Sequence, residues 1–161
     1  MSKPDPKRKM ALYSFLEKIV AGYMTREPRT VTRQTSMGEL GRIFKKDDFN
    51  AFPVVDGTQV IGVMSKFDFL SCFVFTTTRM VPRYDELMKR VAGDFMSAEF
   101  IYVGPETKLT RVIELMVDHQ VRSMPVMNDD QRLAGMIARG DVIRALEDSI
   151  NNKADARDHR L

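Results

Sequence analysis

Hydrophobic residues recur along the chain at two spacings, one typical of helices and one typical of strands. Five apolar residues at helical spacing predict an amphipathic helix: Leu109, Val112, Ile113, Met116 and Val117. Two short apolar runs follow it, residues 124–127 and 133–137, and their length is typical of strands. The turn-forming residues 128–132 between these runs predict a hairpin. With a short strand at residues 101–103, this half of the chain is predicted as a strand, a helix, two strands and a closing helix.

The same order of apolar runs occurs earlier in the chain and indicates an internal duplication. Met24 and Met96 stand 72 positions apart, and Pro53 and Pro125, each followed by valine, share that offset. Beyond the predicted hairpin turn the offset becomes 73, because the second copy carries one extra residue in that turn. Surface turns accept insertions more readily than strands do. The chain is therefore predicted to be an α/β protein of the α+β kind, built from two βαββα repeats.

The duplication divides the chain into five predicted segments. They are a leading helix at 1–19, the first repeat at 20–73, a connector at 74–90, the second repeat at 91–147 and a polar tail at 148–161. The leading helix is amphipathic near Met10 to Ala21, and the second half of the connector is helical after Pro82. The connector is too apolar for a flexible linker, so the module itself or a partner subunit is expected to cover it.

The composition is that of a folded protein without a nucleic-acid interface. Hydrophobic residues make up 43% of the 161 positions and aromatic residues 9%. The formal net charge is only +3, from 25 Lys and Arg against 22 Asp and Glu, and the basic residues are scattered apart from residues 7–9. A nucleic-acid interface requires a concentrated basic face. DNA and RNA are therefore unexpected partners, whereas small phosphorylated ligands are compatible with this charge.

The cysteine content and the hydrophobic profile predict a cytoplasmic protein. Cys72 is the lone cysteine and lies in an apolar run, where a buried thiol in a reducing compartment is the ordinary state. No run reaches the ~18 apolar residues that span a bilayer. Glu17 and Lys18 interrupt the N-terminal apolar stretch, which disfavours a signal peptide. We expect no membrane association.

The polar residues show no pattern typical of catalysis or of metal binding. His119 and His159 fall in a predicted helix and in the tail, without a nearby cysteine or a metal-spaced partner. No glycine-rich phosphate loop of the Walker or dinucleotide type occurs. The paired acids at 47–48 and 129–130 lie at a predicted helix end and turn tip, where charged side chains are normally solvated. The methionines follow helix and strand spacing, which is typical of core residues. The chain is predicted not to be an enzyme and to bind no metal.

Three motifs occur twice in the same order. They are Tyr23-Met24-Thr25 with Phe95-Met96-Ser97, Ala51 to Asp56 with Ser123 to Asn128, and Gly62 to Asp68 with Gly135 to Asp141. In these motifs the chain resembles tandem cystathionine-β-synthase-type (CBS) domains, the pair called a Bateman module, over about residues 20–147. The resemblance implies two half-domains that pack with pseudo-twofold symmetry and form two clefts for adenosine ligands.

The glycine-to-aspartate motif has two interpretations from its residues alone. The carboxylate of Asp68 can accept hydrogen bonds from both hydroxyls of a ribose, while Ser65 and the free amides of a helix start favour a phosphate, with Lys66 adding charge. Alternatively, Ser65 and Asp68 form a capping box. The second copy retains Asp141 but carries Ala138, which has no hydroxyl to cap. Together with the resemblance, this retention favours ribose binding by both aspartates.

The resemblance implies further ligand-binding residues. Related modules place a phosphate-contacting arginine at the position of Arg122, where the first copy has Asn50, and Arg139 follows Ala138. An exposed surface charge is the alternative for both arginines. The implied adenine slot consists of Thr30, Val31, Thr32 and Ala51 in the first copy and of Ile101, Tyr102, Val103 and Ser123 in the second. Because Ala138 removes a hydroxyl, the two clefts are expected to be unequal.

Together these expectations describe a regulatory sensor of AMP, ADP, ATP or a related adenosyl compound that controls an unknown partner protein. A homodimer is expected, because family modules commonly pair and the apolar residues 69–75 supply surface for a contact. A protein-interaction scaffold with empty or degenerate clefts is the alternative, and Ala138 supports it. A transcriptional regulator is disfavoured, because the fewer than ~25 residues before the first copy contain no helix-turn-helix pattern.

Overall fold

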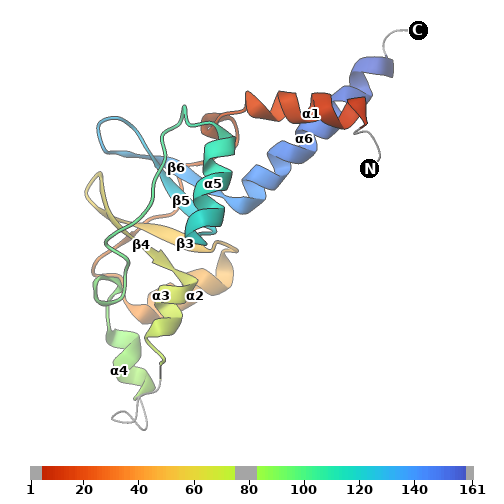
Figure 1. The fold of residues 1–161 in the computed structure, drawn as a ribbon. Helices are drawn as coiled ribbons and strands as arrows, with labels where there is room; N and C mark the ends of the chain where they lie inside the picture. The colour runs from red at the N-terminus through yellow and green to blue at the C-terminus, as the bar shows by residue number, and fades with distance from the viewer. Residues whose placement is uncertain (1–4, 75–82, 159–161) are drawn as a thin grey trace. The chain divides into compact units, whose positions relative to one another are not determined.

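The computed structural model describes residues 5–74 and 83–158, which form two compact units (Figure 1). The terminal unit contains the described residues of segments 1–26, 102–128 and 134–161. The middle unit contains those of segments 27–101 and 129–133. Each unit combines a small sheet with helices, which confirms the predicted α+β class.

The middle unit holds the body of the first copy. Its elements are β2 (Val31–Thr32), α2 (Met37–Lys46), β3 (Ala51–Asp56), β4 (Gln59–Ser65), α3 (Lys66–Ser71), α4 (Tyr84–Lys89) and the 3-10 helix η2 (Ala92–Asp94). The sheet order is β2-β3-β4, with β2 parallel to β3 and β3 antiparallel to β4. Gly57 takes a φ of 61° in the β3–β4 turn, a conformation that glycine adopts readily. The predicted strand, helix, hairpin and closing helix are all present.

The terminal unit holds the body of the second copy. Its elements are α1 (Pro6–Leu16), the 3-10 helix η1 (Val20–Gly22), β1 (Thr25–Arg26), α5 (Leu109–His119), β5 (Ser123–Met127), β6 (Leu133–Ala138) and α6 (Arg139–Asp158). The sheet order is β1-β6-β5. The strand predicted at residues 101–103 is reduced to a parallel bridge between Val103 and Val126, equivalent to the pairing of Val31 with Val54.

The segment near the start of each copy, which we call its lead segment (residues 23–26 and 95–98), pairs with the last strand of the other copy. In the terminal unit, β1 lies antiparallel to β6, with Arg26 opposite Gly135. In the middle unit, Ser97 and Val63 exchange two backbone hydrogen bonds of 2.9 and 3.0 Å. Each compact unit therefore combines the body of one copy with the lead segment of the other, which the contiguous sequence repeat does not reveal.

A glycine makes each of these pairings possible. A Cβ atom added to Gly135 would lie 2.5 Å from the carbonyl oxygen of Thr25, and one added to Gly62 would lie 2.9 Å from that of Ser97. No side chain fits at either distance, so the two glycines of the repeated motif allow the backbones to approach closely.

The leading helix is shifted from its predicted range near Met10 to Ala21. The helix α1 ends at Leu16, because the amides of Val20 and Ala21 donate instead to the carbonyls of Thr107 and Pro105 over 2.9 and 2.8 Å. The helix α1 lies beside α6 in the terminal unit, as Figure 1 shows. Within the described residues, no helix is both long enough and apolar enough to cross a membrane.

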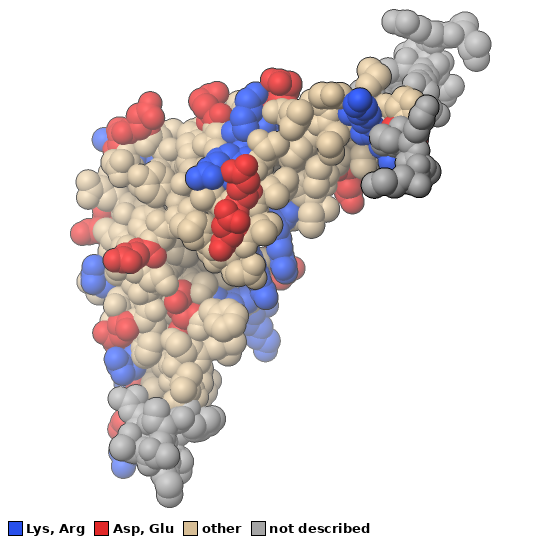
Figure 2. Space-filling model, in the orientation of Figure 1, with Lys and Arg blue, Asp and Glu red and all other residues tan. Residues whose placement is uncertain are grey.

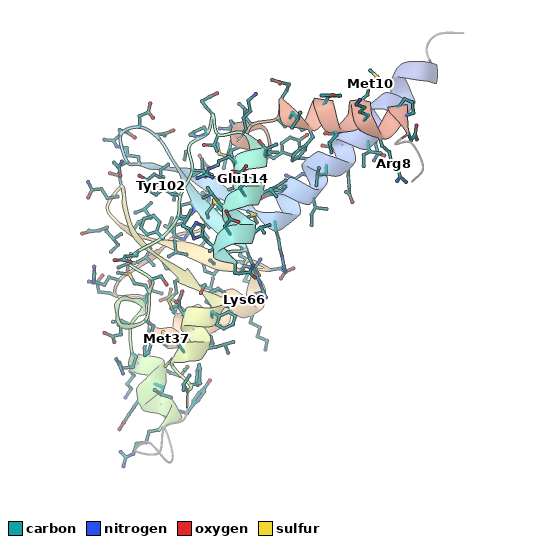
Figure 3. All side chains as sticks on the ribbon, viewed as in Figure 1. Arg8, Met10, Met37, Lys66, Tyr102 and Glu114 are labelled. Atoms are coloured by element: carbon teal, nitrogen blue, oxygen red, sulfur yellow. The ribbon has the colours of Figure 1, made fainter. Side chains whose placement is uncertain are left out.

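Both units have a core of aliphatic, aromatic and methionine side chains. The ring of Phe52 lies 5.0 Å from that of Phe44 in the middle unit, where Met37 (labelled in Figure 3) is also fully buried. Cys72 is 6% exposed and belongs to the same core, as expected for a buried thiol. The terminal unit buries Leu109, Val112, Met124, Val126 and Ile137.

Candidate functional site

Asp68, the aspartate of the first copy, lies in the first turn of α3 and closes the start of that helix. Ser65 is the N-cap, and its Oγ accepts a hydrogen bond from the Asp68 amide over 3.0 Å. In return, Asp68 Oδ2 accepts hydrogen bonds from the Ser65 amide and hydroxyl over 2.7 and 2.6 Å. This is a complete capping box. The capping interpretation of Ser65 and Asp68 is therefore correct, and it engages only one oxygen of the carboxylate.

We expect Ser65→Ala to lower the free energy of unfolding by about 0.5–2 kcal/mol, because the substitution removes the N-cap hydroxyl. Urea denaturation of the variant measures this loss. Ser14 is an exposed serine within α1 and provides the matched control. Equal unfolding free energies for Ser65→Ala and Ser14→Ala would contradict the capping role.

Asp141, the aspartate of the second copy, also contacts the start of its own helix. Asp141 Oδ2 accepts a hydrogen bond from the Ala138 amide over 2.8 Å, the half of a capping box that needs no serine. As expected, Ala138 forms no reciprocal capping box, but Asp141 still contacts its helix start through the Ala138 amide. The missing hydroxyl removes only the reciprocal bond. Retention of Asp141 is consistent with a structural as well as a ligand-binding role.

The second oxygen of each aspartate faces a polar group outside the capping contact. The Ser97 hydroxyl donates to Asp68 Oδ1 over 3.1 Å, and Ser97 belongs to a lead segment. Arg144 pairs with Asp141 Oδ1 at 3.2 Å and also donates to the carbonyl of Tyr23 over 3.0 Å. Sequence reasoning missed both residues. Arg144 could have been found from its i,i+3 spacing to Asp141, whereas the pairing of Ser97 with the first copy has no local signal.

A cation stacked on an aromatic ring accompanies each lead segment. Lys18 Nζ lies 5.0 Å from the ring centre of Tyr23, and Arg90 lies 4.9 Å from that of Phe95. The side-chain hydrogen bond from Arg90 lowers the pKa of Asp94. Lys18 and Arg90, at equivalent positions of the chain, thus stabilise the two lead segments, which carry Thr25 and Ser97.

The cations predicted at the two sites differ in their partners. Lys66, labelled in Figure 3, lies 3.7 Å from the carboxylate of Asp48. Arg122 and Arg139 are adjacent, because the Arg139 amide donates to the Arg122 carbonyl over 3.0 Å. Both arginines are exposed, and neither forms an ion pair with another residue in the part of the chain that the structure describes.

The residues predicted to form the adenine slots fall into buried and accessible groups. Val31, Ala51 and Val103 are buried in the cores, with exposed fractions of 3%, 8% and 5%. Accessible positions are Thr30 and Thr32 in the first copy and Tyr102 in the second, whereas Ile101 and Ser123 are half-buried. In each copy these residues lie on neighbouring chain segments: β2 carries Val31 and Thr32 beside β3 with Ala51, and Val103 bridges to β5, which carries Ser123.

Other chemistries find no support in residues 5–74 and 83–158. No group of three or more His, Cys, Asp or Glu residues in these ranges could hold a metal ion. His119 is exposed in the last turn of α5, and His159 lies outside the described residues. Figure 2 shows basic and acidic residues interspersed on the visible face, without a concentrated basic field.

Comparisons with known proteins agree with the duplication. A family model for the CBS domain matches residues 20–74 and 92–148. The chloroplastic CBS domain-containing protein CBSX1 of Arabidopsis thaliana is 25% identical over 148 residues, covering 78% of this chain and 63% of that protein. The chain spans 63%, 46% and 22% of the length of three curated relatives that it matches.

Solved structures with the same fold include proteins crystallised with adenosine compounds. The structure of CBSX2, an Arabidopsis thaliana protein, in complex with AMP is 25% identical, with a TM-score of 0.68, and the match covers 79% of this chain and 94% of that chain. The CBS domain pair of protein MJ0100, in complex with 5′-methylthioadenosine and S-adenosyl-L-methionine, shares the fold at 20% identity with a TM-score of 0.66, over 79% of this chain and 98% of that chain.

Proposed function

The chain belongs to the CBS domain family, and on that premise we propose that it is a regulatory module that binds an adenosine nucleotide and signals its presence to a partner protein. CBS-pair proteins are typically regulatory, and the described residues contain no recognisable catalytic centre. The ligand is AMP, ADP, ATP or a related adenosyl compound. The module acts in the cytoplasm, where the thiol of Cys72 stays reduced.

The observation that carries this proposal is the equivalent placement of Asp68 and Asp141. Each aspartate uses Oδ2 for the start of its own helix and presents Oδ1 to another side chain, Ser97 of a lead segment for Asp68 and Arg144 of the same helix for Asp141. A hydroxyl and an exposed guanidinium exchange partners easily. The two hydroxyls of a ribose can therefore donate to Oδ1 without disturbing the helix start.

The relatives support the ligand class. CBSX2, at 25% identity, is crystallised with AMP, and adenosine compounds share the ribose that a half-buried carboxylate recognises. The nucleotide then acts by its preference for one of two conformations of the module, since a ligand shifts an equilibrium only by its differential affinity.

Titration calorimetry of the purified protein tests this function. We expect saturable binding of at least one of AMP, ADP, ATP and S-adenosyl-L-methionine below millimolar concentration, and no heat from GMP, which has the same ribose and phosphate but another base. If the protein binds no adenosine compound at millimolar concentration, the sensor is excluded and the interaction scaffold takes its place.

We also propose a homodimer formed through α1 and α6. Leu12 on α1 and Ile150 on α6 are 62% and 64% exposed, and Met10 of α1 (labelled in Figure 3) is 58% exposed. Apolar side chains so exposed on two packed helices indicate a surface that another subunit covers.

Sedimentation velocity is expected to show a dimer for the parent protein and a monomer for Ile150→Glu, because a carboxylate cannot be buried unpaired in an apolar contact. Tyr84→Glu on α4, where the tyrosine is 65% exposed, is the control and stays dimeric. A parent protein that sediments as a monomer at high micromolar concentration would rule out the dimer.

A further inference from the structure

The two aspartate sites differ in charge, and from this we infer that they select nucleotides by phosphate number. The second-copy site, with Asp141, binds the polyphosphate forms ADP and ATP in preference to AMP. The first-copy site, with Asp68, accepts AMP or an uncharged adenosyl compound at least as well as ATP. This inference rests on the proposed function, because it assigns ligand classes to the same two sites.

Three arginines lie on the segments next to the second aspartate: Arg139 and Arg144 on α6 with Asp141, and Arg122 just before β5. Arg122 and Arg139 are joined by the backbone hydrogen bond of 3.0 Å, and Arg144 pairs with Asp141 at 3.2 Å. Three guanidinium groups against one carboxylate give this cluster a net formal charge of +2. Because Arg122 and Arg139 have no acidic partner among the described residues, their charge is available to an anion. Arg144 has five N–H donors, so its guanidinium can contact a phosphate when a ribose takes its place on Asp141 Oδ1.

The equivalent positions of the first copy lack this excess of positive charge. Asn50 stands in the place of Arg122, Ser71 in the place of Arg144, and Lys66 in the place of Arg139. Lys66 is already paired with Asp48, whose counterpart in the second copy is an uncharged glutamine. One ammonium group against Asp48 and Asp68 gives this cluster a net formal charge of −1.

Charge then decides which ligand each site prefers. Each additional phosphate adds about one negative charge, which a cluster of charge +2 attracts and a cluster of charge −1 repels. The groups are exposed, so solvent and salt weaken each pairwise interaction. The formal charges of the two clusters differ by three. Acting on a triphosphate, this difference is nevertheless expected to change the ratio of ATP to AMP affinity at least tenfold between the two sites.

Two single variants isolate the sites for calorimetry. Asp68→Asn leaves the second-copy site intact, and Asp141→Asn leaves the first. AMP and ATP are titrated into each variant without divalent cations, at about 50 mM and about 300 mM salt. Asp68→Asn is expected to bind ATP at least tenfold more tightly than AMP, with the ATP affinity falling more steeply with salt. Asp141→Asn is expected to bind AMP at least as tightly as ATP.

Removing the charge of Arg139 tests whether this residue produces the preference for ATP. In the Asp68→Asn protein, Arg139→Gln is expected to weaken ATP binding at least threefold while leaving the affinity for adenosine, which has no phosphate, unchanged. Arg111→Gln removes the same charge from α5 of the same unit, where Arg111 pairs with Glu114 at 2.9 Å, and serves as the control that leaves both affinities unchanged.

The outcomes separate this inference from the proposed function. If both single variants bind adenosine compounds with the same ratio of ATP to AMP affinity, or with the reverse ratio, the assignment by charge is wrong and nucleotide sensing stands. If the parent protein binds none of AMP, ATP and adenosine, the proposed function and the inference both fail.

Discussion

Replacing Asp68 or Asp141 with alanine is expected to lower the affinity for adenosine nucleotide at least tenfold while the protein remains folded. A carboxylate that accepts hydrogen bonds from ribose hydroxyls contributes about 1.5–3 kcal/mol per charged hydrogen bond, and about 1.4 kcal/mol already corresponds to a factor of ten. The larger loss falls on whichever site the tested nucleotide occupies. Calorimetric titration with AMP, ADP and ATP measures it.

The same substitutions also remove a contact at a helix start, so binding and stability are measured together. Loss of the capping contact is expected to cost about 0.5–2 kcal/mol of unfolding free energy. Glu39 occupies the equivalent third position of α2, where Ser36 is the N-cap, and Glu39→Ala controls for removal of a first-turn acid. Variants of both aspartates that melt lower but bind every nucleotide like the parent protein would make them structural caps only.

Gly135→Ala is expected to lower the free energy of unfolding by about 1–3 kcal/mol, the range for overpacking a filled site. The new Cβ would lie 2.5 Å from the Thr25 carbonyl oxygen and 3.0 Å from the sulfur of Met24, so the pairing of β1 with β6 must open or shift. A backbone oxygen in a paired strand has little freedom to move. The substitution therefore tests directly whether the first lead segment pairs with the second copy.

Gly140→Ala provides the matched control, because a Cβ at Gly140 meets no atom within 4 Å. Gly140 lies in the first turn of α6, where alanine is a better helix former than glycine, by up to about 1 kcal/mol. Urea denaturation should therefore rank Gly140→Ala at or above the parent protein and Gly135→Ala well below it. Equal stabilities of the two variants would contradict the pairing.

The sequence predicts the bodies of the repeats but not their lead segments. The hairpin between β3 and β4 is predicted by the spacing of apolar residues, the turn residues and the offset between the copies. The same patterns predict α5, β5 and β6 in the second copy. The pairing of Ser97 with Val63 and of Arg26 with Gly135 joins residues remote in sequence through backbone hydrogen bonds. Such pairings leave no periodic pattern, so local reasoning assigned each lead segment to its own copy.

In the candidate site, too, the sequence predicts the local contacts and not the remote ones. The i,i+3 spacing of Ser65 and Asp68 predicted both the cap and the carboxylate, because a helix start has a local sequence signature. The contact of Ser97 with Asp68 depends on the remote pairing and was not predictable. Asp141 shows that a missing N-cap hydroxyl does not free its partner, since the backbone amide of Ala138 still donates.

Native mass spectrometry of the freshly purified protein, with and without added AMP, gives the decisive test of nucleotide sensing, because it reports the mass of any bound nucleotide and the subunit number in one spectrum. We expect a dimer that carries the mass of an adenosine nucleotide, either retained from the host cell or acquired on addition of AMP, with no equivalent uptake of GMP. A protein that stays free of every adenosine compound, or takes up GMP equally, would rule out adenosine-nucleotide sensing.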